Sequence, residues 1–98
     1  DVEDFVIEKI SEDEYLLSGR LEIDYIHEKF PELQLPEGEY QTLSGYIVMT
    51  SEIIPEAGQE IALDNYIFTI EDVDETKIEI VRIKVLSPDQ EESIDNLS

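Results

Sequence analysis

The spacing of hydrophobic positions changes twice along the chain, and its first segment has the pattern of strands. Residues 5–10 and 15–18 are rich in apolar and β-branched side chains, and the polar residues 11–14 separate them. Such runs, bounded by polar turn residues, are typical of strands that pair as a hairpin. Gly19 follows the second run and releases the backbone from strand geometry. We therefore expect two N-terminal strands.

From Glu22 onward the hydrophobic period becomes helical. One stripe with the spacing i, i+3, i+4 and i+7 carries Ile23, Ile26, His27 and Phe30. Lys29 complements the negative end of the helix dipole, and Pro31 cannot continue the helix. These features predict a short first helix.

A second helix is predicted for residues 43–51, with Thr42 as its N-cap. Ile47 and Val48 are β-branched, and Gly45 costs a helix about 1 kcal/mol relative to alanine. The sequence would therefore also allow a strand. Leu43, Ile47 and Thr50 are spaced as on one face of a helix, which favours the helix. Gly45 would permit the close approach of another element.

After a turn at 55–58 the chain has the alternation of a β-meander. Strands are predicted at 61–63 and 66–70, joined by an Asp-Asn pair because both residue types tolerate positive φ. A further turn is predicted at 72–76.

The last predicted strand spans 78–85. Its apolar residues fall on even-numbered positions up to Ile80 and on odd-numbered positions from Val81 onward. A strand cannot place both residues on one sheet face without a bulge, so we expect a bulge or a segment buried on both sides. Arg82 and Lys84 would then point away from the core.

The order of elements, β-β-α-α-β-β-β, predicts an α+β domain in which two short helices pack on one face of an antiparallel sheet. The length of 98 residues suits one domain, which we assign to residues 1–85. Residues 86–98 are acidic, unpatterned and rich in Ser, Asp and Asn, which predicts a disordered C-terminal tail.

Composition narrows the classes of function. The chain has 26 acidic and 6 basic residues, and its net charge is −20. Nucleic acids and anionic lipids are bound through Lys and Arg, so neither nucleic-acid binding nor direct lipid insertion is expected. The acidic surface is interpreted as solubilising, with attraction of cations or a basic partner as the alternative. The absence of cysteine fits a cytosolic domain, and no segment has the roughly 20 apolar residues of a membrane helix.

The main candidate metal site is an acidic cluster formed by Glu71, Asp72, Asp74 and Glu75. Mg²⁺ and Ca²⁺ prefer carboxylate oxygens. The cluster departs from the EF-hand pattern because Lys77 stands where glycine is required and Ile83 where the bidentate glutamate belongs. A solvated hairpin turn is therefore the favoured interpretation and a Mg or Ca site the alternative. The same alternatives apply to residues 12–14.

No catalytic group is predicted. His27 is the only histidine, and without a clear partner it is expected to be packed or hydrogen-bonded. For Arg20 a structural salt bridge is favoured over an anion-binding or docking role. The glycines are too far apart for a phosphate loop, and no serine has the flanking glycines of a nucleophile elbow. We expect a non-enzymatic protein that requires no cofactor.

Three short motifs follow one another in a fixed order. They are Tyr15-Leu16-Leu17-Ser18-Gly19-Arg20, Thr42-Leu43-Ser44-Gly45 and Ile54-Pro55-Glu56-Ala57-Gly58. Over residues 5–85 their order and spacing resemble the CorC/HlyC transporter-associated domain, a C-terminal module of bacterial membrane proteins with paired CBS domains. The resemblance implies that the matching positions determine the fold rather than catalyse a reaction. These positions are Gly19, Arg20, Thr42, Leu43, Gly45, Pro55 and Gly58.

The resemblance also implies a function. Some proteins of this family are linked to magnesium and cobalt efflux, and others are labelled hemolysins. For this chain it implies a regulatory or docking module on the cytoplasmic side of the bacterial inner membrane. The implied partners are the CBS and transmembrane domains of the same parent protein, or a second copy in a homodimer. A divalent-cation sensor is the alternative. The fold is also grouped with a flavin-binding superfamily, but no residue here supports FAD, so an FAD or adenine-nucleotide site rests on analogy alone.

Overall fold

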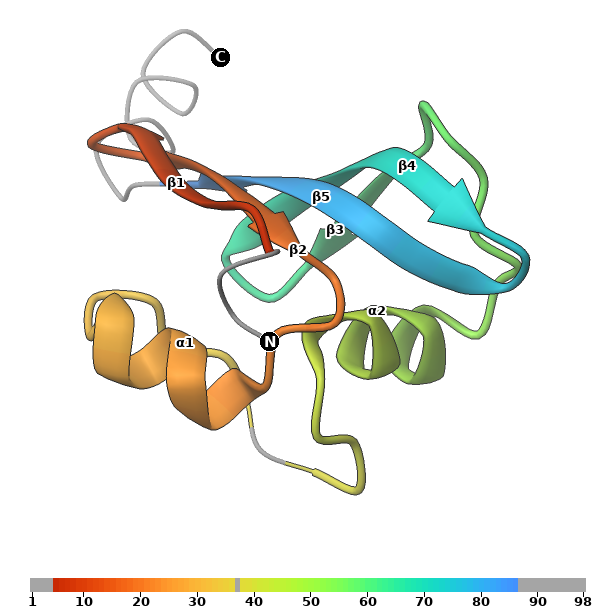
Figure 1. The fold of residues 1–98 in the computed structure, drawn as a ribbon, viewed down its shortest axis with the longest axis horizontal. Helices are drawn as coiled ribbons and strands as arrows, with labels where there is room; N and C mark the ends of the chain where they lie inside the picture. The colour runs from red at the N-terminus through yellow and green to blue at the C-terminus, as the bar shows by residue number, and fades with distance from the viewer. Residues whose placement is uncertain (1–4, 37, 87–98) are drawn as a thin grey trace, which may run out of the picture.

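One antiparallel sheet with two helices on one face makes up the fold (Figure 1). The computed structural model describes residues 5–36 and 38–86. Within them, the sheet order is β1-β2-β5-β4-β3, with every neighbouring pair antiparallel. The strands are β1 (Ile7–Ser11), β2 (Glu14–Ser18), β3 (Glu60–Leu63), β4 (Tyr66–Asp74) and β5 (Lys77–Val85). The helices are α1 (Ile23–Lys29) and α2 (Leu43–Ser51), which confirms the predicted order and class.

The path of the chain explains the strand order. After β2 the chain leaves the sheet, forms α1 and α2 beneath it, and returns as β3 at the far edge (Figure 1). The meander of β3, β4 and β5 then fills the space back to β2. Consequently the end of β2, the start of α2 and the start of β5 meet, although they lie far apart in the sequence.

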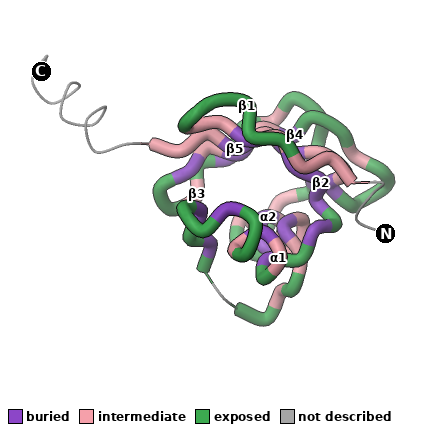
Figure 2. The backbone as a smooth tube through the Cα atoms, turned by 60° about the vertical axis from the view of Figure 1, so that its left-hand side comes forward, coloured by how far each residue is buried: buried purple, intermediate pink, exposed green. Residues whose placement is uncertain are grey.

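The core lies between the sheet and the helices. Alternate positions of β2 and β4, such as Leu17 and Phe68, face the helices, and the helices present Ile26 and Ile47 in return. Figure 2 shows the buried positions gathered where the two layers face each other. The largest fully buried side chains are Tyr15, Tyr46, Phe68, Leu17, Leu21, Ile26, Leu33, Leu43, Ile47, Ile70, Ile78 and Ile83.

Two bulges between β4 and β5 explain why the alternation of apolar residues shifts by one position in β5. Ile70 pairs with Val81, Asp72 with Ile80, and the next pair joins Val73 to Ile78. One residue of β4, Glu71, and one residue of β5, Glu79, are therefore extra. The extra residue in β5 allows Ile78 and Val81, which are three positions apart, both to be fully buried, and the matching extra residue in β4 restores the register of the two strands. The predicted bulge is confirmed.

Two predicted boundaries were wrong. The turn expected at 72–76 is shorter, because β4 continues to Asp74 and only two residues connect it to β5. Pairing persists because Asp74 lies opposite Lys77 and half-buried Val73 lies opposite Ile78. At the other end, β1 begins at Ile7 rather than at residue 5 and extends to Ser11.

The predicted C-terminal tail lies almost entirely outside the described residues. Leu86 is described, and its N–H donates to the carbonyl oxygen of Asn65 at 2.9 Å. Disorder of the remaining tail and the domain limits 1–85 stay predictions. Among residues 5–36 and 38–86 no helix has the length and apolarity required to cross a membrane.

Candidate functional site

The first two motifs meet in space and join three elements. The Gly19 N–H donates to the carbonyl oxygen of Glu79 in β5 at 2.9 Å, and the Gly19 carbonyl oxygen accepts from the Ser44 N–H of α2 at 2.8 Å. The Ser44 hydroxyl oxygen in turn accepts from the Ile78 N–H of β5 at 3.1 Å. The chain between β2 and α1 is thus tied to the beginnings of both α2 and β5.

Gly19 is required at this junction for steric reasons. A Cβ atom built on Gly19 would lie 2.1 Å from the carbonyl oxygen of Ile78 and 2.9 Å from its carbonyl carbon. Real side chains do not approach a backbone oxygen so closely, and a backbone atom cannot turn aside as a flexible side chain can. The glycine of the first motif therefore allows β5 to pass directly against the end of β2.

The second motif caps α2 and uses the free amides of its first turn. The Thr42 side-chain oxygen accepts from the Gly45 N–H at 3.1 Å. The Leu43 N–H donates to the Leu21 carbonyl oxygen at 3.0 Å, and the Ser44 N–H is bound by Gly19. Because the protein itself accepts from these three amides, the start of α2 offers none of them to an anion.

The third motif is a turn that leads from α2 to β3. Pro55 is buried, and Gly58 has φ of +90°, a conformation that favours glycine. The Gly58 N–H donates to the Ile70 carbonyl oxygen at 2.6 Å. The Ile70 N–H donates to the Gln59 carbonyl oxygen, so the turn is fixed to β4.

A groove of about 460 Å³, here called the motif groove, runs over this junction. Among the described residues, half-buried Val48 supplies its accessible apolar wall, Arg20 and Lys77 supply cations, and no carboxylate lines it; the Ile78 side chain beneath it is fully buried. It therefore differs in charge from the rest of a chain with 26 acidic residues. The groove is lined by Gly19, Arg20, Thr42, Ser44, Gly45, Val48, Thr76, Lys77 and Ile78.

Arg20 forms the salt bridge favoured from the sequence. Its Nε donates to the Glu79 carboxylate at 3.0 Å, and 54% of the Arg20 side chain remains exposed. Arg20 also borders two smaller grooves beside the motif groove. A docking or anion-binding role for Arg20 stays a prediction.

The acidic cluster at the β4–β5 hairpin is open and partly engaged. The Glu71 carboxylate accepts from Arg82 Nε at 3.0 Å, and Asp72 Oδ1 accepts from the Val73 N–H. Glu75 occupies the turn with φ of 59°. Within the described ranges, no three His, Cys, Asp or Glu side chains come close enough together to hold an ion. The cation site on Glu71, Asp72, Asp74 and Glu75 stays a prediction.

The second acidic cluster, residues 12–14, lies at the β1–β2 turn. Asp13 accepts from the Ser11 hydroxyl at 3.0 Å and lies 4.0 Å from Lys84 Nζ. Glu14 lies 3.6 Å from a terminal nitrogen of Arg82. Arg82 and Lys84 therefore point away from the core, as predicted, and pair with carboxylates on the open face of the sheet.

His27 has the hydrogen-bonded role expected of it. Its Nε2 accepts from the Leu35 N–H at 3.1 Å and so fixes the chain that follows α1. No hydrogen bond or ion pair joins it to a carboxylate or a serine in the part of the chain that the structure describes. This arrangement is structural and does not resemble a catalytic pair.

Two buried tyrosines form phenol–carboxylate pairs that the sequence did not reveal. Tyr15 donates to Glu32 Oε2, and Tyr46 donates to Asp64 Oδ2, each at 2.6 Å. Burial, reinforced by the carboxylate, raises the pKa of both phenols. The bond from Tyr15 is the largest influence on Glu32 and lowers its pKa to about 2. Both tyrosines occupy ordinary apolar positions in the pattern, so only the tertiary structure identifies their partners.

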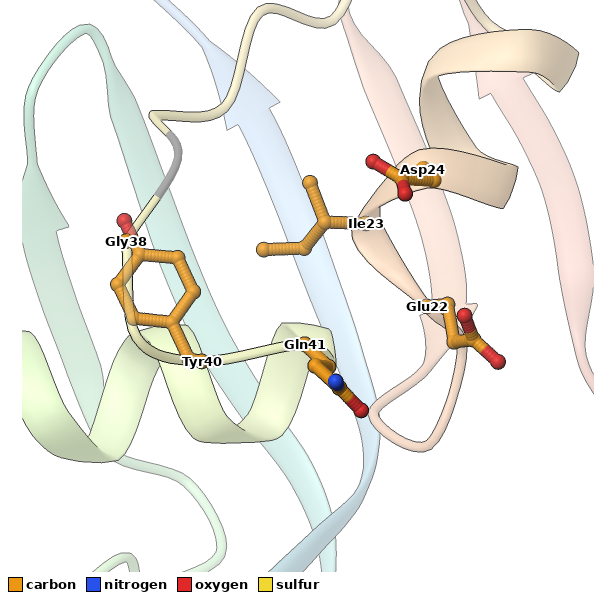
Figure 3. A pocket seen from close by; sticks show the side chains of 6 residues that line it. All are labelled: Glu22, Ile23, Asp24, Gly38, Tyr40 and Gln41. Atoms are coloured by element: carbon orange, nitrogen blue, oxygen red, sulfur yellow. The ribbon is translucent and has the colours of Figure 1, made fainter.

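A second, polar groove of about 210 Å³ lies between α1 and the segment before α2 (Figure 3). Ile23 and the Tyr40 ring face each other across it, and the Ile23 N–H donates to the Gln41 carbonyl oxygen. The side chains of Glu22 and Asp24 lie on the same side as Ile23, at the start of α1. Two carboxylates on a single turn are too few to form a cation site.

Comparison with known proteins identifies the family. The model of the transporter associated domain CorC_HlyC matches residues 8–87. The CorC_HlyC domain of Nitrosomonas europaea is 30% identical with a TM-score of 0.69, and the match covers 82% of this chain and 95% of that one. A hemolysin domain of Enterococcus faecalis V583 is 26% identical with a TM-score of 0.70, covering 84% and 99%. The CorC_HlyC domain of a Xylella fastidiosa Temecula1 hemolysin, in complex with Mg²⁺ and Mn²⁺, is 22% identical with a TM-score of 0.65, covering 84% and 99%. No curated protein matches. The chain belongs to the CorC_HlyC family of transporter-associated domains.

Proposed function

We propose that the chain is a non-enzymatic docking and regulatory module of a bacterial membrane ion transporter, on the cytoplasmic side of the inner membrane. Its family is that of transporter-associated domains, and one structure of the same fold is described as the associated region of a putative Mg²⁺ and Co²⁺ transporter. Another, from Porphyromonas gingivalis, belongs to a CBS domain protein. The partners would be the CBS and transmembrane domains of the same parent protein.

One observation carries the proposal: the family motifs build a surface, not a reactive centre. Gly19, Thr42 and Ser44 use their polar groups to join β2, α2 and β5. Within residues 5–36 and 38–86, the groove above them contains cations and an apolar wall but no nucleophile with an adjacent base. Such a groove fits a role in contact better than a role in chemistry.

Deletion of the domain from the parent transporter tests the proposal. Cells that express the transporter truncated just before residue 1 are expected to show altered magnesium and cobalt resistance while the rest of the protein assembles normally. Unchanged resistance and unchanged assembly would contradict a regulatory role. Glu8→Gln, a change at an exposed position of β1 away from the motif groove, serves as a control that leaves transport unchanged.

A divalent-cation sensor is the second candidate. The complex of the Xylella fastidiosa domain with Mg²⁺ and Mn²⁺ favours it. In this chain the excess of carboxylates would supply oxygen ligands, with Glu71, Asp72, Asp74 and Glu75 as the proposed site. Cation binding there would adjust the docking surface at the adjacent hairpin, where Thr76 and Lys77 line the motif groove.

A further inference from the structure

The outward face of α2 is uncharged in a chain that is otherwise strongly acidic. No Asp, Glu, Lys or Arg occurs between Leu43 and Ser51, whereas 33% of the whole chain is charged. Leu43, Tyr46 and Ile47 face the core, Gly45 and Val48 are half-buried, and Met49 is exposed on the outer side. A helix that is apolar on both faces is usually covered on both.

Exposed apolar side chains occur on α2 and in the loop that follows it. Met49 is 51% exposed, and Ile54, three residues after the end of α2, is 76% exposed. They are two of the three large apolar side chains that are exposed in the described part of the chain. Val48, which precedes Met49 in the chain, packs partly against the core and lines the motif groove. The surface therefore presents both an apolar projection and an apolar hollow.

The charges at the two ends of α2 are opposite in sign. Arg20 and Lys77 flank its N-terminal half in the motif groove. Glu52 caps its C-terminal end, and Glu56 is exposed shortly after it. A second α2 packed antiparallel would bring the acidic end of one helix to the basic end of the other. A two-fold axis requires this kind of self-complementarity.

We propose that the motif groove and the outward face of α2 bind a second copy of this chain, with two α2 helices antiparallel about a two-fold axis. Met49 and Ile54 of one copy would enter the motif groove of the other, against Val48. Glu52 would approach Arg20 and Lys77 of the second copy. This inference rests on the proposed function, since it gives the docking module a defined occupant.

The size of the face predicts a weak dimer. Nine helical residues span only about 14 Å, so the contact falls at the small end of specific interfaces. Each copy carries a net charge of −20, and the two copies repel each other through the rest of their surfaces. Salt shortens the range of this repulsion from about 10 Å at 0.1 M to about 3 Å at 1 M. The dissociation constant should therefore fall as salt is added, unlike that of an interface dominated by ion pairs.

Sedimentation equilibrium of the 98-residue chain from micromolar to millimolar concentration tests the proposal. The average mass is expected to rise toward that of two chains. Met49→Glu should raise the dissociation constant by about tenfold or more, because it places a carboxylate in an apolar contact twice per dimer. Ile10→Glu is the matched control. It adds the same charge at an exposed apolar position of β1, which lies away from α2 (Figure 1), and should change the constant much less.

A charge exchange tests the antiparallel arrangement. Lys77→Glu and Glu52→Lys should each weaken the dimer severalfold, and the double variant should recover most of the loss. Circular dichroism establishes that each variant is folded. A chain that stays monomeric at millimolar concentration, or equal effects of Met49→Glu and Ile10→Glu, would overturn the proposal. If deletion of the domain still alters cation resistance, the docking function stands and another segment of the parent protein occupies the groove.

Discussion

Gly19 lies so close to Ile78 that a Cβ atom on residue 19 would be 2.1 Å from the Ile78 carbonyl oxygen. The strand end and β5 can pass each other at this distance only if residue 19 has no side chain. The same contact places the Ile78 N–H within reach of the Ser44 hydroxyl, so the steric requirement and the hydrogen bond occur together. The position of β5, and therefore one wall of the motif groove, depends on this glycine.

Gly19→Ala is expected to destabilise the fold. The added methyl group forces apart two backbone segments, a kind of overpacking that costs about 1–3 kcal/mol. For a domain of this size each kcal/mol lowers the thermal midpoint by about 4–8 °C. A melt followed by circular dichroism should therefore show a fall of several degrees or more.

The control for this variant is Thr50→Ala at an exposed position of α2. A substitution of that kind changes stability by no more than about 0.5 kcal/mol. Equal midpoints for Gly19→Ala and Thr50→Ala would show that β5 can move away from the strand end without cost, and the steric role of Gly19 would be wrong.

Local patterns predicted the fold well because each of its elements has a local signal. The cap at Thr42 and helical spacing identified α2 despite its β-branched residues, and the parity change in β5 located a bulge. The turn at 72–76 was placed too early because pairing resumes after the bulge at Glu71, with Val73 opposite Ile78 and Asp74 opposite Lys77. Polar composition alone could not reveal that pairing.

The candidate site was less predictable than the fold. The motif positions were identified by resemblance, but their hydrogen bonds join residues separated by up to 60 positions, as between Gly19 and Glu79. The groove above them exists only after β2, α2 and β5 have come together. In the same way, the bond from Tyr15 to Glu32 depends on how α1 packs on the sheet, and no local period encodes it.

Replacement of Thr42 tests its role as the cap of α2. Thr42→Ala removes the oxygen that accepts from the Gly45 N–H and should lower the free energy of unfolding by about 1 kcal/mol. Thr42→Ser retains an oxygen at the same position and should lose much less. Urea unfolding of the two variants gives the comparison, and equal losses would mean that the methyl group, not the cap, is what matters.

Glu32 should titrate well below a normal glutamate. The hydrogen bond from Tyr15 is the main cause, and Lys9 adds to it, so that the pKa of Glu32 is about 2. Because this pKa is lower in the folded than in the unfolded chain, the stabilisation is complete above about pH 4.5 and is lost as the pH falls toward 2. Carboxyl carbon shifts in an NMR titration measure the value directly.

Tyr15→Phe should raise the pKa of Glu32 toward its usual value, since the ring remains but the donor is gone. Tyr46→Phe is the matched control, because Tyr46 donates to Asp64 instead. A pKa of Glu32 that does not change in Tyr15→Phe would assign the shift to Lys9 and the backbone.

High pH should unfold the chain through the same two tyrosines. Burial and the adjacent carboxylates raise the pKa of Tyr15 and Tyr46 above the usual value of 10. Their contribution to stability is therefore complete below about pH 10 and is lost as the pH rises further. Tyrosinate absorbance should show that these two phenols ionise only together with unfolding, as followed by circular dichroism. Ionisation of all 5 tyrosines in a chain that is still folded would contradict this.

A cation-binding measurement distinguishes the docking module from the cation sensor. Bound Mg²⁺ or Mn²⁺ at 100 times its dissociation constant adds about 2.7 kcal/mol to stability, which raises the melting midpoint by more than about 10 °C in a domain of this size. The combined change Glu71→Gln, Asp72→Asn and Asp74→Asn should abolish the shift if these carboxylates hold the ion. Replacing Glu8, Glu28 and Glu60 with Gln is the control, because it removes equal charge at exposed positions outside both acidic clusters. Melts at matched ionic strength remove general screening, which is large for a net charge of −20. A shift no larger than that given by NaCl would contradict the sensor and leave docking as the function of the domain.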